Sequence, residues 1–151
     1  MKNLDNIVMN FRICHQTYVT VLDLLKKMSL QFTPSLEDIL DLTSYAKKLA
    51  DNATFLICRN GNQIIGSIIF YQNNTTSVLY IPLVWVDEQF RGFGVAKRMF
   101  EILIKFGKDK GLSYIHLEVL KINISANNLY KSLGFSKLED RLEKTLMGRP
   151  I

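Results

Sequence analysis

The spacing of hydrophobic residues follows a helical period in the first third of the chain. Apolar residues recur three apart between Val19 and Met28 and predict a helix over about residues 17–30. Thr33-Pro34 is typical of an N-cap followed by a proline in the first helical turn. We therefore expect a second helix that begins there and carries the apolar residues from Leu36 to Leu49.

Between residues 54 and 86 the period shortens, and β-branched and aromatic residues dominate. Three runs, 54–59, 63–71 and 77–86, predict strands. Asn60-Gly61 predicts a hairpin turn between the first two, and QNNTT predicts a longer turn before the third. Together they predict an antiparallel meander. Pro82 cannot donate to a strand ladder, so we expect a bulge or a parting of strands there.

The helical period returns after residue 92. The pattern predicts a long helix over 92–110, a strand over 113–120 and a short helix over about 125–133 that Gly134 stops. A last strand or strand pair occupies 135–147. Because the long helix returns the chain to a parallel neighbour, we expect an α/β fold with a mixed sheet. No repeat, low-complexity tract or linker is seen, which predicts a single domain over residues 1–151.

Composition agrees with one soluble domain. The 151 residues are 48% hydrophobic and 22% charged, as in ordinary globular proteins. No apolar segment reaches the roughly 18 to 20 residues that a membrane span requires. The first ten residues contain Asp5 and lack the apolar core of a signal peptide. These features predict a soluble, cytoplasmic protein without a membrane partner.

Cysteine usage and charge add weaker constraints. Cys14 and Cys58 lie in no CxxC motif or metal-ligand cluster, so we expect two buried thiols in a reducing compartment and no metal, with a disulfide as the alternative. The net charge is +5, and its positive excess lies in residues 89–151. An anionic ligand, nucleic acid or a solvated basic surface would each explain this excess. Because the basic residues are scattered singly, we expect no nucleic-acid partner.

A strand, a glycine turn and a helix start follow one another between Val84 and Phe100. Backbone N–H groups of a first helical turn, with the positive end of the helix dipole, can bind phosphate. The stretch is not a dinucleotide fingerprint, because Lys97 stands where the third glycine would be. It also lacks the Gly-Lys-Ser/Thr of a P-loop. The pattern indicates an anion site of another kind.

Two motifs resemble those of the GCN5-related N-acetyltransferase (GNAT) superfamily. Arg91-Gly92-Phe93-Gly94-Val95-Ala96 is similar to its R/Q-x-x-G-x-G/A signature. Residues 117–135 are similar to its later block, with matches at Leu117, Val119, Asn123, Ala126, Leu129, Tyr130, Gly134 and Phe135. The resemblance covers residues 54–147 well. It implies the fold of that superfamily, a mixed, mostly antiparallel sheet flanked by helices, with a splayed central strand pair.

The resemblance implies acetyl-CoA as the cofactor. Backbone amides after Arg91 would grip its pyrophosphate, and the pantetheine arm would pair with a strand edge at Val84–Val86. Lys97 and Arg98 either pair with phosphates or lie on a solvated surface. Asn123 either donates to a pantetheine carbonyl or caps the next helix. The expected cofactor-binding residues are Val84, Trp85, Val86, Arg91, Gly92, Phe93, Gly94, Val95, Ala96, Lys97, Asn123 and Tyr130.

The resemblance also implies that Tyr130 protonates the departing coenzyme A thiolate, and a packed core tyrosine is the alternative. The general base is open, because no Asp or Glu occurs between Asp51 and Asp87 and Tyr80 stands near the expected place. His116 and Glu118 share one strand face and are our candidates, directly or through water, although either could be structural. More remote acidic candidates for binding a cationic acceptor are Glu37, Asp38 and Asp41.

We therefore expect an acetyl-CoA-dependent N-acetyltransferase in which a neutral primary amine attacks the thioester directly. The stretches SYAKKLADNATFLIC and GSIIFYQNN resemble superfamily members encoded with bacterial surface-polysaccharide genes. That likeness favours a small-molecule acceptor, an amino sugar or sugar nucleotide. The alternatives are a protein N-terminal amine, as on a ribosomal protein, or a domain that binds acetyl-CoA without catalysis. A homodimer is left open.

Overall fold

The computed structural model describes residues 7–32 and 34–151, and the chain forms two compact units. Unit 1 comprises Met1–Ile69 and Leu83–Met99, and unit 2 comprises Phe70–Pro82 and Phe100–Ile151. Two residues used in the predictions lie outside the described residues. They are Thr33, the predicted N-cap, and Asp5, which was used as evidence against a signal peptide. The predicted single domain over 1–151 stays a prediction.

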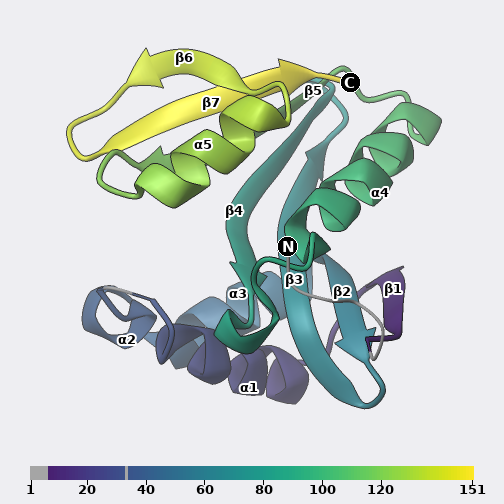
Figure 1. The fold of residues 1–151 in the computed structure, drawn as a ribbon, viewed down its shortest axis with the longest axis vertical. Coiled ribbons are helices and arrows are strands. Elements are labelled where there is room, and N and C mark those ends of the chain that lie inside the picture. The colour runs from purple at the N-terminus through teal and green to yellow at the C-terminus, as the bar shows by residue number, and fades with distance from the viewer. Residues whose placement is uncertain (1–6, 33) are drawn as a thin grey trace. The chain divides into compact units, whose positions relative to one another are not determined.

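After an N-terminal strand that was not predicted, a group of helices, a group of strands, and then helix, strand, helix and a final strand pair follow in the predicted order (Figure 1). Their order is β1 (Met9–Cys14), α1 (Tyr18–Ser29), α2 (Leu36–Ile39), α3 (Leu42–Asn52), β2 (Thr54–Asn60), β3 (Gln63–Asn73), β4 (Val78–Val86), η1 (Glu88–Phe90), α4 (Val95–Asp109), β5 (Tyr114–Leu120), α5 (Ile124–Ser132), β6 (Ser136–Asp140) and β7 (Lys144–Pro150). Hydrogen-bonded strands follow the order β1-β2-β3-β4-β5-β7-β6. Pairing is parallel between β4 and β5 and antiparallel at β1–β2, β5–β7 and β6–β7. This mixed α/β sheet confirms the predicted fold class.

In unit 1, α1 begins where its sequence provides a cap. The side chain of Thr17 accepts a hydrogen bond from the Thr20 amide. The buried stripe of α1 includes Val21, Leu25 and Met28, and α1 packs against α3, which buries Ala46 and Leu49. Hydrophobic burial of this stripe, rather than helix propensity, holds α1 in place.

The predicted second helix is wrong as one continuous element. It is two helices, α2 and α3, because Leu40 adopts an extended backbone with φ −138°. The Asp41 carboxylate accepts hydrogen bonds from the Thr43 amide, the Thr43 hydroxyl and the Ser44 hydroxyl. These bonds lower the pKa of Asp41 below its usual value, and the bond from the Thr43 hydroxyl has the largest effect. Asp41 thus starts a new helix instead of continuing the old one.

Strand β1 is an element that the sequence analysis missed. It pairs antiparallel with β2, from Met9 opposite Asn60 to Cys14 opposite Phe55. Its sequence MNFRIC alternates between apolar and polar residues, and the apolar ones are the less exposed. The signal for a half-buried strand was therefore present. A hairpin turn follows β2 as predicted, but at Gly61-Asn62 instead of Asn60-Gly61, with Gly61 at φ +61°.

In unit 2, β5 lies between β4 and β7. The parallel ladder joins Val78–Ile81 to Tyr114–Leu117, and its register ends directly before Pro82. Proline has no backbone N–H to donate, which explains why this ladder stops there. The C-terminal part of the chain forms the strand pair β6–β7, one of the two predicted options. Gly111 and Gly134 end α4 and α5 at positive φ, as predicted.

The remaining predictions on burial are partly confirmed. Both cysteines are free thiols, Cys58 buried and Cys14 only half-buried. Burial raises the pKa of Cys58 to about 11. Among the described residues, no helix is both long and apolar enough to cross a membrane.

Candidate functional site

The glycine turn, residues 91–94, leads directly into the first turn of α4 in unit 1. Gly92 and Gly94 adopt φ values of +85° and +78°, and both are exposed. The Arg98 amide donates to the Gly94 carbonyl at 3.1 Å, so α4 starts directly after the turn. The backbone N–H groups of Val95, Ala96 and Lys97 come before this first bond, so they have no acceptor within the helix. With the helix dipole, this arrangement can bind an anion such as a phosphate group.

Another glycine lets the start of α4 approach β3 closely. A Cβ at Gly66 would lie 3.1 Å from the side chains of both Val95 and Met99. Such contacts are tighter than ordinary van der Waals packing, so a larger residue would push the helix start outward. Gly66 therefore fixes where the first turn of α4 lies in unit 1.

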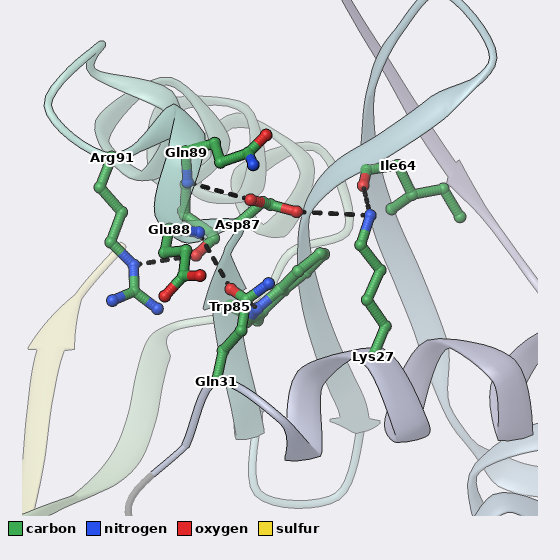
Figure 2. A network of polar contacts seen from close by, with 9 residues as sticks. Lys27, Gln31, Ile64, Trp85, Asp87, Glu88, Gln89 and Arg91 are labelled. Carbon is green, nitrogen blue, oxygen red and sulfur yellow. Dashed lines mark hydrogen bonds and ion pairs between the residues drawn. The ribbon is translucent and has the colours of Figure 1, made fainter.

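The residue after β4 anchors the segment that leads into the glycine turn (Figure 2). Asp87 is only 5% exposed, and its carboxylate lies 3.4 Å from the Lys27 ammonium and accepts the Gln89 amide at 3.0 Å. Its own amide donates to the Ile65 carbonyl at 2.8 Å. A buried charge requires such partners. Asp87 is therefore fixed to both α1 and β3.

The strand end predicted to pair with pantetheine is partly occupied by other contacts. Trp85 is buried, and its indole N–H donates to Gln31 Oε1 at 3.2 Å, so its side chain belongs to the core of unit 1. Val84 and Val86 are half-buried. Arg91 Nε donates to the Val86 carbonyl at 3.0 Å and thereby folds the turn back onto the strand. Trp85 can therefore offer a ligand its backbone only.

The two cations in the first turn of α4 differ in their contacts. The Arg98 guanidinium lies over the Phe11 ring of β1, 5.6 Å from its centre. Lys97 is exposed beside the amides of the turn. Of the two, Lys97 is the better placed to meet a bound phosphate.

In unit 2, Tyr130 packs among aromatic rings. Its ring centre lies 5.8 Å from the centres of Phe100 and Phe135, and the residue is 7% exposed. Burial raises the pKa of Tyr130 to about 12. The hydroxyl therefore stays protonated at neutral pH and is able to donate.

Asn123 is the N-cap of α5. Its Oδ1 accepts the Ala126 amide at 3.1 Å, which is the capping role that the sequence analysis weighed against pantetheine binding. The cap uses the amide oxygen and not the amide N–H₂. The capping role is therefore present, and the binding role stays a prediction.

The two candidate bases have different surroundings on β5. Glu118 Oε1 accepts the Tyr80 hydroxyl at 3.2 Å and pairs with Arg141 at 2.8 Å. Burial, and then the nearby Glu118 charge, raise the pKa of Tyr80, so this hydroxyl stays protonated. His116 packs near the Tyr114 ring, and burial lowers its pKa, which favours the neutral imidazole. Only Glu118 is held in a defined orientation by two polar partners.

Glu118 lines a surface hollow of about 440 Å³ in unit 2. The residues that line it are Glu118, Arg141, Leu142, Glu143 and Lys144. Both signs of charge meet there beside the candidate base. Of the remoter acidic candidates, Asp41 caps α3, whereas Glu37 and Asp38 lie exposed in the first turn of α2. In residues 7–32 and 34–151, no three His, Cys, Asp or Glu side chains are grouped to hold a metal ion.

The structure thus places the predicted residues in two sets, one per unit. Unit 1 brings together Val84–Val86 and Arg91–Lys97, and unit 2 holds His116, Glu118, Asn123 and Tyr130. Four residues that hold these sets in place were not predicted from the sequence: Arg141 beside Glu118, and Lys27, Gln31 and Asp87 around the end of β4. Asp87 carried a usable signal, since a carboxylate directly after a buried strand requires a partner.

A family model and several curated proteins match this chain. Residues 21–135 match the model of the Acetyltransferase (GNAT) family. The N-acetylaspartate synthetase of Danio rerio is 26% identical over 74% of this chain and 39% of its own length. The N-acetyltransferase 8F1 of Rattus norvegicus is 28% identical over 69% of this chain and 48% of its own length. The chain therefore spans less than half the length of these curated relatives.

A solved structure agrees with the fold. The PaiA N-acetyltransferase of Thermoplasma acidophilum, in complex with coenzyme A, superposes with a TM-score of 0.75 at 15% identity. The match covers 94% of this chain and 99% of that one. At such low identity the likeness shows the fold alone.

Proposed function

Because the chain belongs to the GNAT acetyltransferase family, we propose that it transfers an acetyl group from acetyl-CoA to a primary amine by direct attack. The family, fold and enzyme class predicted from the sequence are those of the matched family. The observation that carries the proposal is the glycine turn before α4, where Gly92 and Gly94 are exposed, adopt positive φ and lead into a helical turn whose first amides have no intrahelical acceptor.

In this proposal the amides of residues 92–97 bind the pyrophosphate of acetyl-CoA. Lys97 supports them with its charge, since its side chain is exposed at the same turn. The backbone of Val84–Val86 pairs with the amides of the pantetheine arm, and Asn123 donates to one of its carbonyls. The acetyl-CoA supplies the thioester, and the protein supplies binding and proton transfer.

Tyr130 is the proposed proton donor to the departing thiolate. Its hydroxyl stays protonated because burial raises its pKa to about 12. A hydrogen bond from this hydroxyl would stabilise the negative charge that develops on sulfur. The aromatic contacts with Phe100 and Phe135 hold the ring in one orientation, which such a role requires.

Glu118 is the proposed base that takes a proton from the attacking amine, directly or through water. The hydrogen bonds from Tyr80 and Arg141 to Glu118 Oε1 hold the carboxylate in one orientation, as a general base requires. His116 is the alternative, and its lowered pKa keeps it neutral and able to accept a proton.

A pair of variants separates the two bases. We expect Glu118→Gln to lower kcat/KM by about a hundredfold or more, because the amide cannot take the proton of the attacking amine. His116→Ala should turn over like the parent. If His116 is the base instead, the acidic limb of the pH profile lies below the ordinary histidine pKa of about 6.5 and disappears in His116→Ala. Unchanged turnover in both variants would assign deprotonation to water or to another group.

The proposed acceptor is a small-molecule amine, an amino sugar or sugar nucleotide. One relative is named for an amino acid product, N-acetylaspartate, which also favours a small acceptor. A protein N-terminal amine and a non-catalytic acetyl-CoA-binding role remain the alternatives. The predicted cytoplasmic location and the absence of a nucleic-acid partner stay predictions, and a homodimer stays open.

A transfer assay tests the proposal. Acetyl-CoA is incubated with the protein and a panel of amino sugars, amino acids and N-terminal peptides, and products are identified by mass spectrometry. We expect one acetylated amine for each free coenzyme A thiol released. Tight acetyl-CoA binding without any acetylated amine would favour the non-catalytic role.

A further inference from the structure

The last turn of α1 and the residues after it contact the end of β4 from one side (Figure 2). Lys27 and Gln31 provide these contacts. The Lys27 ammonium pairs with Asp87, and it lies 5.3 Å from the centre of the Trp85 ring. Gln31 Oε1 accepts both the Trp85 indole N–H and, at 2.9 Å, the Glu88 amide. All these residues belong to unit 1.

Lys27 also joins two strands. Besides pairing with Asp87 after β4, its ammonium donates to the Ile64 carbonyl of β3 at 2.9 Å. Asp87 is nearly buried, whereas the Lys27 side chain is 36% exposed. The lysine therefore neutralises a carboxylate that water cannot solvate well. The proposed acetyl transfer itself does not use the Lys27–Asp87 ion pair. The place of this pair beside the glycine turn is therefore still to be explained.

The anchored residues lie directly before the glycine turn. Asp87 accepts the Gln89 amide, the Phe90 amide donates to the Asp87 carbonyl at 2.8 Å, and Arg91 folds back onto Val86. Gly92 and Gly94 have wide conformational freedom and do not define a direction by themselves. The contacts that hold the residues before the turn therefore set its direction together with the packing of the α4 start against Gly66.

We propose that Lys27 is a positioning residue for the phosphate-binding turn, acting through Asp87 and aided by Gln31. The inference rests on the proposed function, because it assigns Lys27 to the acetyl-CoA site. Preorganised donors bind an anion more tightly than donors that must be ordered on binding. Lys27 also cancels the Asp87 charge, which would otherwise repel the phosphates of the ligand.

The test compares three single variants by titration calorimetry with acetyl-CoA. Lys27→Met keeps an apolar stem but loses the ion pair and the Ile64 contact. Lys27→Arg restores a cation. Lys26→Met is the matched control, with the same charge change one residue earlier on α1. We expect Lys27→Met to raise the Kd for acetyl-CoA by roughly tenfold to a hundredfold. Lys27→Arg should recover most of the affinity, and Lys26→Met should bind acetyl-CoA like the parent. The kcat of Lys27→Met at saturating acetyl-CoA should stay within about twofold of the parent value.

Amide hydrogen exchange of the free protein gives a readout that does not need the ligand. Exchange at Glu88–Phe90 should accelerate in Lys27→Met, whereas the hairpin turn at Gly61–Asn62 should be unaffected. A Lys27→Met variant that loses thermal stability but keeps the parent Kd and the parent exchange at Glu88–Phe90 would reduce Lys27 to a purely structural role. A parent protein that does not bind acetyl-CoA would reject the proposed function and the acetyl-CoA role of Lys27 with it. Exchange would then still decide whether Lys27 orders the turn.

Discussion

Tyr130→Phe should keep the fold and most of the affinity for acetyl-CoA but lose most of its turnover. The substitution removes one hydroxyl from a ring that packs against Phe100 and Phe135, so the apolar contacts remain. A general acid typically contributes about a hundredfold to ten-thousandfold, and kcat should fall within that range if thiolate departure limits the rate. Steady-state kinetics at saturating acetyl-CoA measure the change.

Two further measurements make the Tyr130 assignment specific. An acetyl thioester with a more acidic leaving thiol needs less stabilisation, so the defect should shrink with it. Tyr114→Phe is the matched control in the same unit, since Tyr114 is half exposed on β5 and should turn over like the parent. Because burial raises the pKa of Tyr130 to about 12, its ionisation should cause no alkaline fall in kcat below about pH 10. Undiminished turnover in Tyr130→Phe would reject Tyr130 as the acid.

Gly94→Val should abolish binding of acetyl-CoA. Gly94 has φ +78°, a conformation that a β-branched residue rarely adopts, and its side-chain direction is open to solvent. The substitution therefore strains the turn and places methyl groups where a phosphate must approach the backbone. The Kd for acetyl-CoA measures the effect, and circular dichroism checks the fold.

Gly61→Val is the matched control for this strain. Gly61 also lies in unit 1, has φ +61° and has no atom within 4 Å of the added Cβ. It should lose a similar amount of stability but keep its affinity for acetyl-CoA. If a folded Gly94→Val variant binds with the parent affinity, the glycine turn is not the phosphate site.

The part of the candidate site that is local in sequence could be predicted well. Gly92, Gly94 and the apolar pattern that follows them specify a turn and a helix start whatever the rest of the chain does. The turn shifts the start of the helix to Val95, three residues later than predicted, because both glycines adopt positive φ. A pattern of apolar residues cannot reveal such a backbone conformation.

The division of the second helix shows a limit of reasoning from periodicity. Apolar residues at helical spacing continue from Leu36 to Leu49, but Asp41 offers the backbone a competing set of hydrogen bonds. A capping residue inside a periodic run can therefore end one helix and begin another. Periodicity alone does not show which of these two outcomes occurs.

Contacts between residues far apart in sequence could not be predicted. Lys27 meets Asp87, and Arg141 meets Glu118, only because the fold brings together elements that are distant along the chain. Neither cation stands in a motif. The sequence therefore pointed to Tyr130 through a family resemblance and to Glu118 through its place on a strand face, and both roles stay predictions. The groups that contact Glu118 and Asp87 required the structure.

The central claim is that the turn at residues 92–97 holds the phosphates of acetyl-CoA, and calorimetric titration of the parent protein tests it most directly. Acetyl-CoA and NADH, which both contain an adenosine and a pyrophosphate, are titrated side by side. Because the turn lacks the third glycine of a dinucleotide fingerprint, with Lys97 in its place, we expect saturable binding of one acetyl-CoA per chain and no binding of NADH. Equal affinity for NADH, or no heat of binding with acetyl-CoA, would contradict the claim.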